Sequence, residues 1–315
     1  MIFDLNVPWP VNNYTSKPSS QQIITLKNTI VTLYVLGYTH IAINFCLSES
    51  VKVPAKDPSQ INPIQIAQLE KDLKEYEYLK LFTRITMTIS DPSQCQGLSK
   101  LQNYFDIISI QPLTEKALQI ASSNLDIDLI SFNLSSRLPF FLKHKTVGSA
   151  LEKGIKFEIC YSNLISGPAG YTVQGPNENM TLSTTAALAR KNFFNNVLQL
   201  IRASRSRGLV VSSGATGPLQ TRNPDDILNL LKTLGLDHSR AKFCLTGNAE
   251  RVLISGRLRI KSYKQTIQID DTNVKGDVLI NNDREDKLKK SDTLAYKKKL
   301  SDTSSGRLLK KQRTR

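Results

Sequence analysis

Two patterns of apolar residues alternate along most of the chain: short apolar and β-branched runs, and longer stretches with helical spacing. The short runs predict eight strands, at residues 2–5, 39–45, 81–89, 105–110, 127–132, 155–161, 208–212 and 241–245. The longer stretches predict helices at 20–36, 62–77, 97–104, 114–122, 139–152, 181–206, 224–234 and 247–255. Gly37 is a predicted C-terminal cap, and Asn62-Pro63 and Asn223-Pro224 are predicted helix starts.

Eight strand–helix units in series predict an α/β fold. The strands are short and mostly apolar, which is typical of parallel strands covered by helices on the outside. Over about 250 residues, a closed TIM-like (β/α)8 barrel is the natural arrangement. An open, doubly wound parallel sheet is the alternative, and periodicity does not separate the two.

Two segments depart from this pattern. Residues 266–315 are polar and rich in Lys and Arg, with too few apolar residues to offset the entropy lost on ordering. We therefore predict a barrel domain at residues 1–265 and a disordered basic tail at 266–315. Residues 162–180 follow the sixth predicted strand and are expected to form a long loop at the C-terminal face of the barrel.

The charge balance favours a polyanionic partner. The chain has 315 residues, a formal net charge of +15 and a pI near 9.6, with 40% hydrophobic residues to form a core. Residues 287–315 hold eleven Lys or Arg against Asp292 and Asp302, so the segment before them is only modestly basic. Nucleic acid is the first partner class to consider, and the Lys clusters of the tail are also typical of nuclear localisation signals.

The four cysteines stand far apart without a CxxC pair, which argues against a disulfide framework or a zinc module. No apolar run has the length of a membrane span, and the N-terminal residues lack the regions of a signal peptide. We expect a soluble intracellular protein that does not bind membranes.

Catalytic motifs are largely missing. The histidines His40, His144 and His238 are scattered, and no nucleophile elbow, P-loop or HExxH helix occurs. The opening FDLNVPWP resembles the first strand of the polymerase-and-histidinol-phosphatase barrels, in which an aspartate precedes two alternating metal-binding histidines. Here Asn6 and Pro8 stand at the histidine positions, and neither is a suitable ligand for a catalytic transition metal. We predict no catalytic residue, metal site or bound cofactor in this chain.

Charged residues within the predicted strands need partners if they are buried. Asp4, Arg84 and Asp128 each fall in a predicted strand and are expected to point into the barrel. They form either an internal ion-pair cluster, which we favour, or a relic active site.

Ten cations are the candidate RNA-binding residues. Arg202, Arg205 and Arg207 end a long helix just before the seventh strand, where they are suited either to phosphate binding or to capping the helix dipole. The run around Tyr263 is suited to an arm that tracks an RNA backbone. The full set is Arg137, Lys143, Lys145, Arg202, Arg205, Arg207, Arg222, Arg257, Arg259 and Lys261.

Several stretches resemble the thirty-kilodalton protein subunit family of nuclear ribonuclease P and RNase MRP, particularly its fungal members. They are FDLNVPWP, LGYTHIAINF, TRITMTISDPSQ, NLDIDLISF, SRLPFFLKHK, IRASRSRGLVVSSGA and SGRLRIKS, and they run from residue 2 to about 262. The resemblance implies a barrel fold and assembly with ribonuclease P RNA and RNase MRP RNA, a small RRM-like subunit and other protein subunits. It also implies that the RNA carries the chemistry with its own Mg²⁺.

The sequence therefore predicts a noncatalytic RNA-binding subunit of ribonuclease P and RNase MRP ribonucleoproteins, located in the nucleus and nucleolus. Such particles remove the 5′ leader of pre-tRNA and process pre-rRNA. A metal-dependent phosphoesterase on a related barrel is the alternative, and a protein–protein scaffold whose basic tail serves only for import is a third possibility.

Overall fold

The computed structural model describes residues 1–49, 61–91, 93, 95, 98–165, 186–263 and 267–268. Met1–Gln268 forms one compact unit. Nearly all of the predicted tail and residues 166–180 of the predicted loop lie outside the described residues, so the domain boundary stays a prediction. Within the described ranges, no helix is long and apolar enough to cross a membrane.

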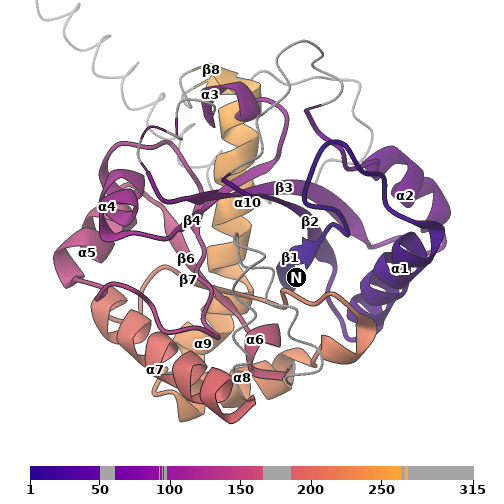
Figure 1. Ribbon diagram of the computed structural model, residues 1–315. Coiled ribbons are helices and arrows are strands. Elements are labelled where there is room, and N and C mark those ends of the chain that lie inside the picture. Colours follow the sequence, from indigo (N-terminus) through magenta and orange to yellow (C-terminus); the bar gives the residue numbers. More distant parts are fainter. Residues whose placement is uncertain are drawn as a thin grey trace, which may run out of the picture. The chain divides into compact units, whose positions relative to one another are not determined.

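Seven parallel strands lie in chain order in one curved sheet, with the helices around it (Figure 1). The strands are β1 (Phe3–Pro8), β2 (His40–Leu47), β3 (Lys80–Ile89), β4 (Ile107–Pro112), β5 (Leu129–Ile130), β6 (Lys156–Cys160) and β7 (Leu209–Ser212). The helices are α1 (Ser20–Val35), α2 (Ile66–Asp72), α3 (Leu98–Leu101), α4 (Glu115–Ser123), α5 (His144–Glu152), α6 (Ser162–Ile165), α7 (Ala186–Ser204), η3 (Pro218–Gln220), α8 (Pro224–Thr233), α9 (His238–Leu245) and α10 (Gly247–Lys261). A short antiparallel pair, β8 (Ser262–Tyr263) and β9 (Ile267–Gln268), follows α10. The predicted TIM-like α/β barrel is confirmed.

The barrel is nearly closed, with its seam between β1 and β7, the two edges of the sheet. The amide of Gly214 donates to the carbonyl oxygen of Asn6 at 2.8 Å. The carboxylate of Asp4 accepts from the amide of Ser213 at 3.0 Å. At this point of the seam the hydrogen-bond acceptor is the side-chain oxygen of Asp4, whereas in a closed ladder it would be a backbone carbonyl oxygen.

The predicted eighth strand at 241–245 is wrong, because these residues lie in α9. Ala241, Cys244 and Leu245 are buried, whereas Phe243 is 42% exposed. Burial at positions i, i+3 and i+4 is helical, and a strand would have buried Phe243 on the same face as its alternate neighbours. The short apolar run could not distinguish the two periods.

The N-terminal mouth of the barrel is closed by α10, which lies behind the strands in Figure 1. Ala249, Val252 and Leu253 of this helix are buried in a cluster with residues near the strand starts: Phe3, Leu5, Ala42, Phe82, Ile107, Leu129 and Val210. At Gly256 the helix comes so close to the barrel that a Cβ atom would lie 1.8 Å from the carbonyl oxygen of Asp106. This helix is therefore part of the core.

The predicted helices are all present, with shifted ends. Helix α8 begins after Asn223, whose side chain accepts from the amide of Asp225, and Gly37 follows the end of α1 with φ at 96°, as expected of a C-terminal glycine. Helix α2 is shorter than the predicted 62–77. The Asn62 side chain accepts from the amide of Ile64 in a turn, and the helix begins only afterwards.

Candidate nucleic-acid interface

A closed ring of hydrogen bonds lies inside the barrel. The guanidinium of Arg84 donates to both carboxylate oxygens of Glu158, at 2.5 and 2.6 Å. Its Nε donates to the hydroxyl of Thr86 at 3.3 Å, and that hydroxyl donates to Asn44 Oδ1 at 2.8 Å. The Asn44 amide donates to Asn6 Oδ1 at 2.8 Å, and the Asn6 amide donates back to Glu158 at 3.3 Å. All five residues are buried, so the ring satisfies polar groups that water does not reach.

The electrostatics of this interior are those of a structural cluster. Burial by itself would raise the pKa of Glu158, but the adjacent Arg84 guanidinium holds that pKa below its usual value. Burial raises the pKa of the Cys46 thiol to about 11 and that of Cys160 well above its usual value. The carboxylate is therefore ionised and fully engaged, and the thiols stay protonated and poorly nucleophilic.

The predicted ion-pair cluster of Asp4, Arg84 and Asp128 is wrong in its partners. Arg84 pairs with Glu158, and Asp128 pairs with Arg259 of α10. Asp4 accepts hydrogen bonds from backbone amides at the seam. Glu158 was not among the predicted residues, although a single carboxylate in the apolar run IKFEICY indicates that this strand carries a buried charge.

Asn6 and Pro8, which stand at the positions of the metal-binding histidines, have structural roles here. The Asn6 amide takes part in the ring, and Pro8 ends β1. Within the described ranges, no group of three or more His, Cys, Asp or Glu side chains is placed to hold a metal ion. His40 is the first residue of β2 and is buried near the N-terminal end of the barrel. Burial lowers its pKa to about 4, so it is neutral at physiological pH.

Six of the ten predicted RNA-binding residues come together where α5 meets α7. The side-chain amides of Asn192 and Asn196 in α7 donate to backbone carbonyls of residues 134–136, which places the exposed Arg137 beside α7. At the C-terminal end of α7, His144 Nδ1 lies 2.7 Å from the carbonyl oxygen of Ala203. We call this surface the α5–α7 face, and its predicted cations are Arg137, Lys143, Lys145, Arg202, Arg205 and Arg207, all exposed.

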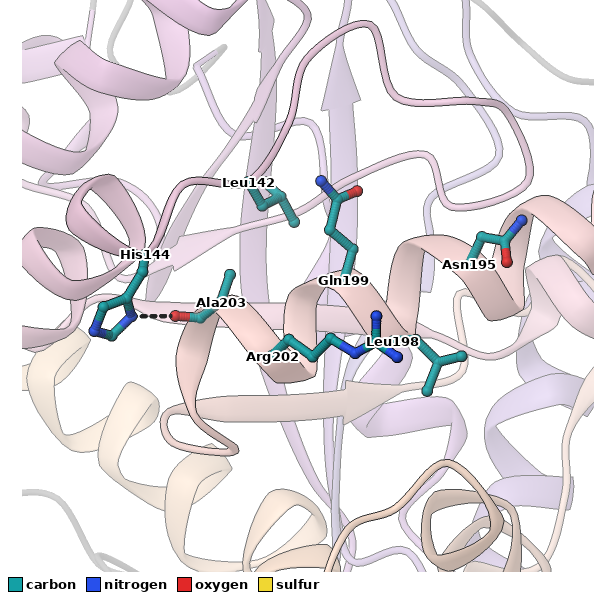
Figure 2. Close-up of a pocket in the computed structure, with 7 residues that line it drawn as sticks. All are labelled: Leu142, His144, Asn195, Leu198, Gln199, Arg202 and Ala203. Carbon is teal, nitrogen blue, oxygen red and sulfur yellow. Dashed lines mark hydrogen bonds between the residues drawn. The ribbon is translucent and has the colours of Figure 1, made fainter.

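A groove of about 440 Å³ lies on this face (Figure 2). It is lined by Leu142 and His144 on one side and by Asn195, Leu198, Gln199, Arg202 and Ala203 of α7 on the other. Because a carbonyl oxygen can only accept, His144 Nδ1 carries the proton in its bond to Ala203, and the bond fixes the ring at the end of the groove.

The corner between α7 and β7 has an unusual backbone. Arg205 and Ser206 have φ values of 52° and 60°, in the left-handed region that residues other than glycine rarely adopt. The corner precedes Leu209, the first residue of β7, so it belongs to the N-terminal end of the barrel, as predicted. The turn leaves the side chains of both Arg205 and Arg207 exposed.

The other four predicted residues lie elsewhere. The half-buried Arg222 donates to the carbonyl oxygens of Leu219 and Thr221, in the loop after β7. The Arg257 guanidinium lies over the ring of Phe82, 5.4 Å from its centroid. The Arg259 side chain is only 6% exposed and contacts Asp128 and three backbone carbonyls, so it has no surface to offer to RNA. The side chain of Lys261 lies outside the described residues.

The α5–α7 face is poor in negative charge. No Asp or Glu occurs between Asp128 and Glu152, or between Glu178 and Asp225, and these stretches contain nearly all of α5 and the whole of α7. Glu115 of α4 reaches the face and pairs with Lys143 at 2.5 Å. Both side chains of that pair are more than half exposed, so the pair is weak and the field of the face stays positive.

Sequence reasoning missed part of this face. Arg190 and Lys191 add two exposed cations to α7, and Phe141, which precedes the groove residue Leu142 in the chain, is 77% exposed. The signal for the cations was the absence of acidic residues along α7. The groove itself gave no signal, because it depends on a contact between residues as far apart as His144 and Ala203.

Comparisons with solved structures agree with the barrel. The chain is similar to one in a cryo-EM structure of archaeal ribonuclease P with mature tRNA, with a TM-score of 0.56, 17% identity, and coverage of 87% of this chain and 100% of that chain. A Xaa-Pro dipeptidase with bound methionine gives a TM-score of 0.50 at 10% identity, covering 81% of this chain and 75% of that chain. At these identities the likeness concerns the fold alone.

Sequence comparisons are more specific. The chain is 44% identical to ribonuclease P/MRP protein subunit RPP1 of Saccharomyces cerevisiae over 89% of each chain. It is 30% identical to probable ribonuclease P protein subunit 3 of Schizosaccharomyces pombe, over 85% of this chain and 98% of that protein. It is 29% identical to ribonuclease P protein subunit p30 of Mus musculus, over 76% of this chain and 83% of that protein. The model of the family described as RNase P subunit p30 matches residues 1–261, and this chain belongs to that family.

Proposed function

We propose that this protein is a noncatalytic, RNA-binding subunit of ribonuclease P and RNase MRP, and that its α5–α7 face contacts the RNA of the particle. The observation that carries the proposal is the cluster of exposed cations on a face with almost no acidic residue. Such a face attracts phosphates at long range and releases counterions on contact.

The relatives support the assignment to these particles, since the proteins from both yeasts and from mouse are named as ribonuclease P or ribonuclease P/MRP subunits. By this proposal, the catalytic RNA and its Mg²⁺ perform the cleavage of pre-tRNA and pre-rRNA, and the chain needs no cofactor. It works in the nucleus, including the nucleolus, beside a small RRM-like subunit and the other proteins of the particle.

Within this proposal the cations have unequal roles. Arg137, Lys145 and the three arginines of the α7 end contact phosphates directly, because their side chains are exposed. Lys143 does so after leaving Glu115, at little cost for an exposed pair. Arg222 and Arg257 are secondary contacts, Lys261 stays a prediction, and the buried Arg259 is removed from the set.

The salt dependence of RNA binding tests the proposal. In the double variant Arg205→Ala/Arg207→Ala, the log–log slope of affinity against salt should become shallower by about 1.4 to 1.8 units, because each phosphate contact contributes about 0.7 to 0.9. The slope is measured by titrating the full chain with ribonuclease P RNA at several salt concentrations. Thermal stability should change little, since both side chains are exposed.

The matched control is Lys71→Ala/Lys74→Ala, which removes two exposed cations near α2, where Glu70, Asp72 and Glu75 are neighbours in sequence. This variant should keep the slope of the wild type. An equal loss of slope in both variants would mean that binding follows net charge alone, and the α5–α7 face would lose its assignment. An unchanged slope with a clear loss of thermal stability in the arginine variant would make those arginines structural.

A further inference from the structure

The groove on the α5–α7 face has features that phosphate binding does not need. Exposed cations are sufficient to neutralise a backbone, and a concave site adds nothing to that task. The groove measures about 440 Å³, within the range of sites that enclose a small molecule. Its size is therefore sufficient for a ligand that has a body as well as a charge.

The walls of the groove combine three kinds of chemistry. Leu142 and Leu198 supply apolar surface, and Asn195 and Gln199 supply side-chain amides that both donate and accept hydrogen bonds. Arg202 supplies a cation at the same wall, and Figure 2 shows that it comes from the same helix as the two amides. An apolar surface, edge-reading amides and a guanidinium match the flat face, polar edge and phosphate of a nucleotide.

An exposed aromatic side chain precedes the groove residue Leu142 in the chain. Phe140 and Leu142 are both buried at 7% exposure, and Phe141 between them is turned outward at 77%. Because both of its neighbours are buried, Phe141 points away from the side of Leu142 and is not among the residues that line the groove. A large aromatic side chain held in water beside cations is typical of a platform on which a base stacks.

We propose that the α5–α7 groove binds one unpaired nucleotide of an RNA single strand. The base lies against Leu142 and Leu198, its edge bonds to Asn195 and Gln199, and its phosphate contacts Arg202. The adjacent base of the same strand, outside the groove, stacks on the exposed ring of Phe141. The inference rests on the proposed RNA-binding function and narrows it, because the bases of a duplex are stacked on each other and cannot enter a groove.

The test compares a short unstructured RNA with the duplex formed by adding its complement, each titrated against the full chain by fluorescence anisotropy. Phe141→Ala should weaken single-strand binding by about ten- to a hundredfold, the loss that corresponds to one stacked base. It should leave duplex binding and the salt slope unchanged, because no charge is removed. The double variant Asn195→Ala/Gln199→Ala should also weaken binding of the single strand and leave binding of the duplex unchanged.

The control is Tyr78→Ala, which removes another aromatic side chain, 71% exposed, outside the α5–α7 face. It should bind both RNAs as the wild type does. As an independent readout, a photoreactive 4-thiouridine in the single strand should cross-link within residues 137–145 or 195–203.

The outcomes separate the two proposals. Wild-type protein that binds neither RNA overturns the proposed function itself. Wild-type protein that binds both RNAs, with Phe141→Ala and Asn195→Ala/Gln199→Ala each unchanged or equally impaired on both, overturns only the groove site. If Phe141→Ala binds RNA normally but no longer co-purifies with the other protein subunits in a reconstituted particle, the groove holds a protein segment and the nucleotide proposal is wrong.

Discussion

The guanidinium of Arg84 forms a two-pronged ion pair with the carboxylate of Glu158, and neither side chain reaches solvent. Breaking a buried pair from one side leaves an uncompensated charge, whereas replacing both partners removes two charges together. Glu158→Leu should therefore lower the free energy of unfolding by about 3 to 5 kcal/mol. The measurement is urea-induced unfolding followed by circular dichroism.

The double variant Arg84→Met/Glu158→Leu is the comparison. It should be more stable than Glu158→Leu alone, because the remaining hydrogen-bonding groups of the ring are neutral. If the double variant is the less stable of the two, the guanidinium contributes mainly through its bonds to Leu5, Thr86 and Ser109.

The raised pKa of Asp4 predicts that the stability of the fold depends on pH. Burial raises its pKa from 3.8 to about 6, although bonds from Ser213 and Asn6 act in the opposite direction. Because the folded pKa exceeds the unfolded one, the contribution to stability is full below about pH 4 and is lost as the pH rises through 6. Asp4→Asn should remove this dependence and unfold at higher urea concentration than the wild type at pH 8, since its amide oxygen can accept the same backbone bonds. Wild-type stability that rises between pH 4 and 7, with Asp4→Asn following the same curve, would contradict this.

Two glycines in helices should respond in opposite directions to substitution by alanine. At Gly256 a Cβ would meet the Asp106 carbonyl oxygen at 1.8 Å, and at Gly148 of α5 it would meet nothing within 4 Å. Gly256→Ala should destabilise by about 1 to 3 kcal/mol or more by pushing α10 off the barrel. Gly148→Ala should stabilise by about 0.5 to 1 kcal/mol through helix propensity. Melting temperatures that move in the same direction would argue against the close approach of α10.

Substitution of the buried Arg259 should have a different effect from substitution of the exposed arginines. Arg259→Ala leaves the carboxylate of Asp128 buried without its cation, so the free energy of unfolding should fall by about 3 to 5 kcal/mol. The protein that remains folded should keep the wild-type salt slope for RNA, in contrast to the Arg205/Arg207 double variant. A shallower slope for Arg259→Ala at a temperature where it is folded would return this residue to the RNA-binding set.

Local signals in the sequence were sufficient for most of the fold. Strands such as 81–89 and the capped helix at 224–234 have periods and caps that act within a few residues, so the βα repeat could be predicted. The prediction of a strand at 241–245 was wrong because the alternate residues Ala241, Phe243 and Leu245 are all apolar, so the run fits either period.

The site was less predictable, for a physical reason. The presence of cations can be read from composition, but whether a cation is exposed depends on distant partners. Arg259 and Arg205 looked equivalent in the sequence, and only the position of Asp128 and the close packing of α10 bury the former. The groove likewise requires α5 and α7 to meet, which no local pattern specifies.

The closure of the barrel floor by α10 has a consequence for biosynthesis. Phe3 and Leu5 leave the ribosome before the residues that cover them, Val252 and Leu253, which follow some 250 positions later. Until then the N-terminal end of the nascent barrel exposes apolar side chains, and such surfaces are bound by chaperones and promote aggregation. Folding of this chain is thus completed only after synthesis has passed α10.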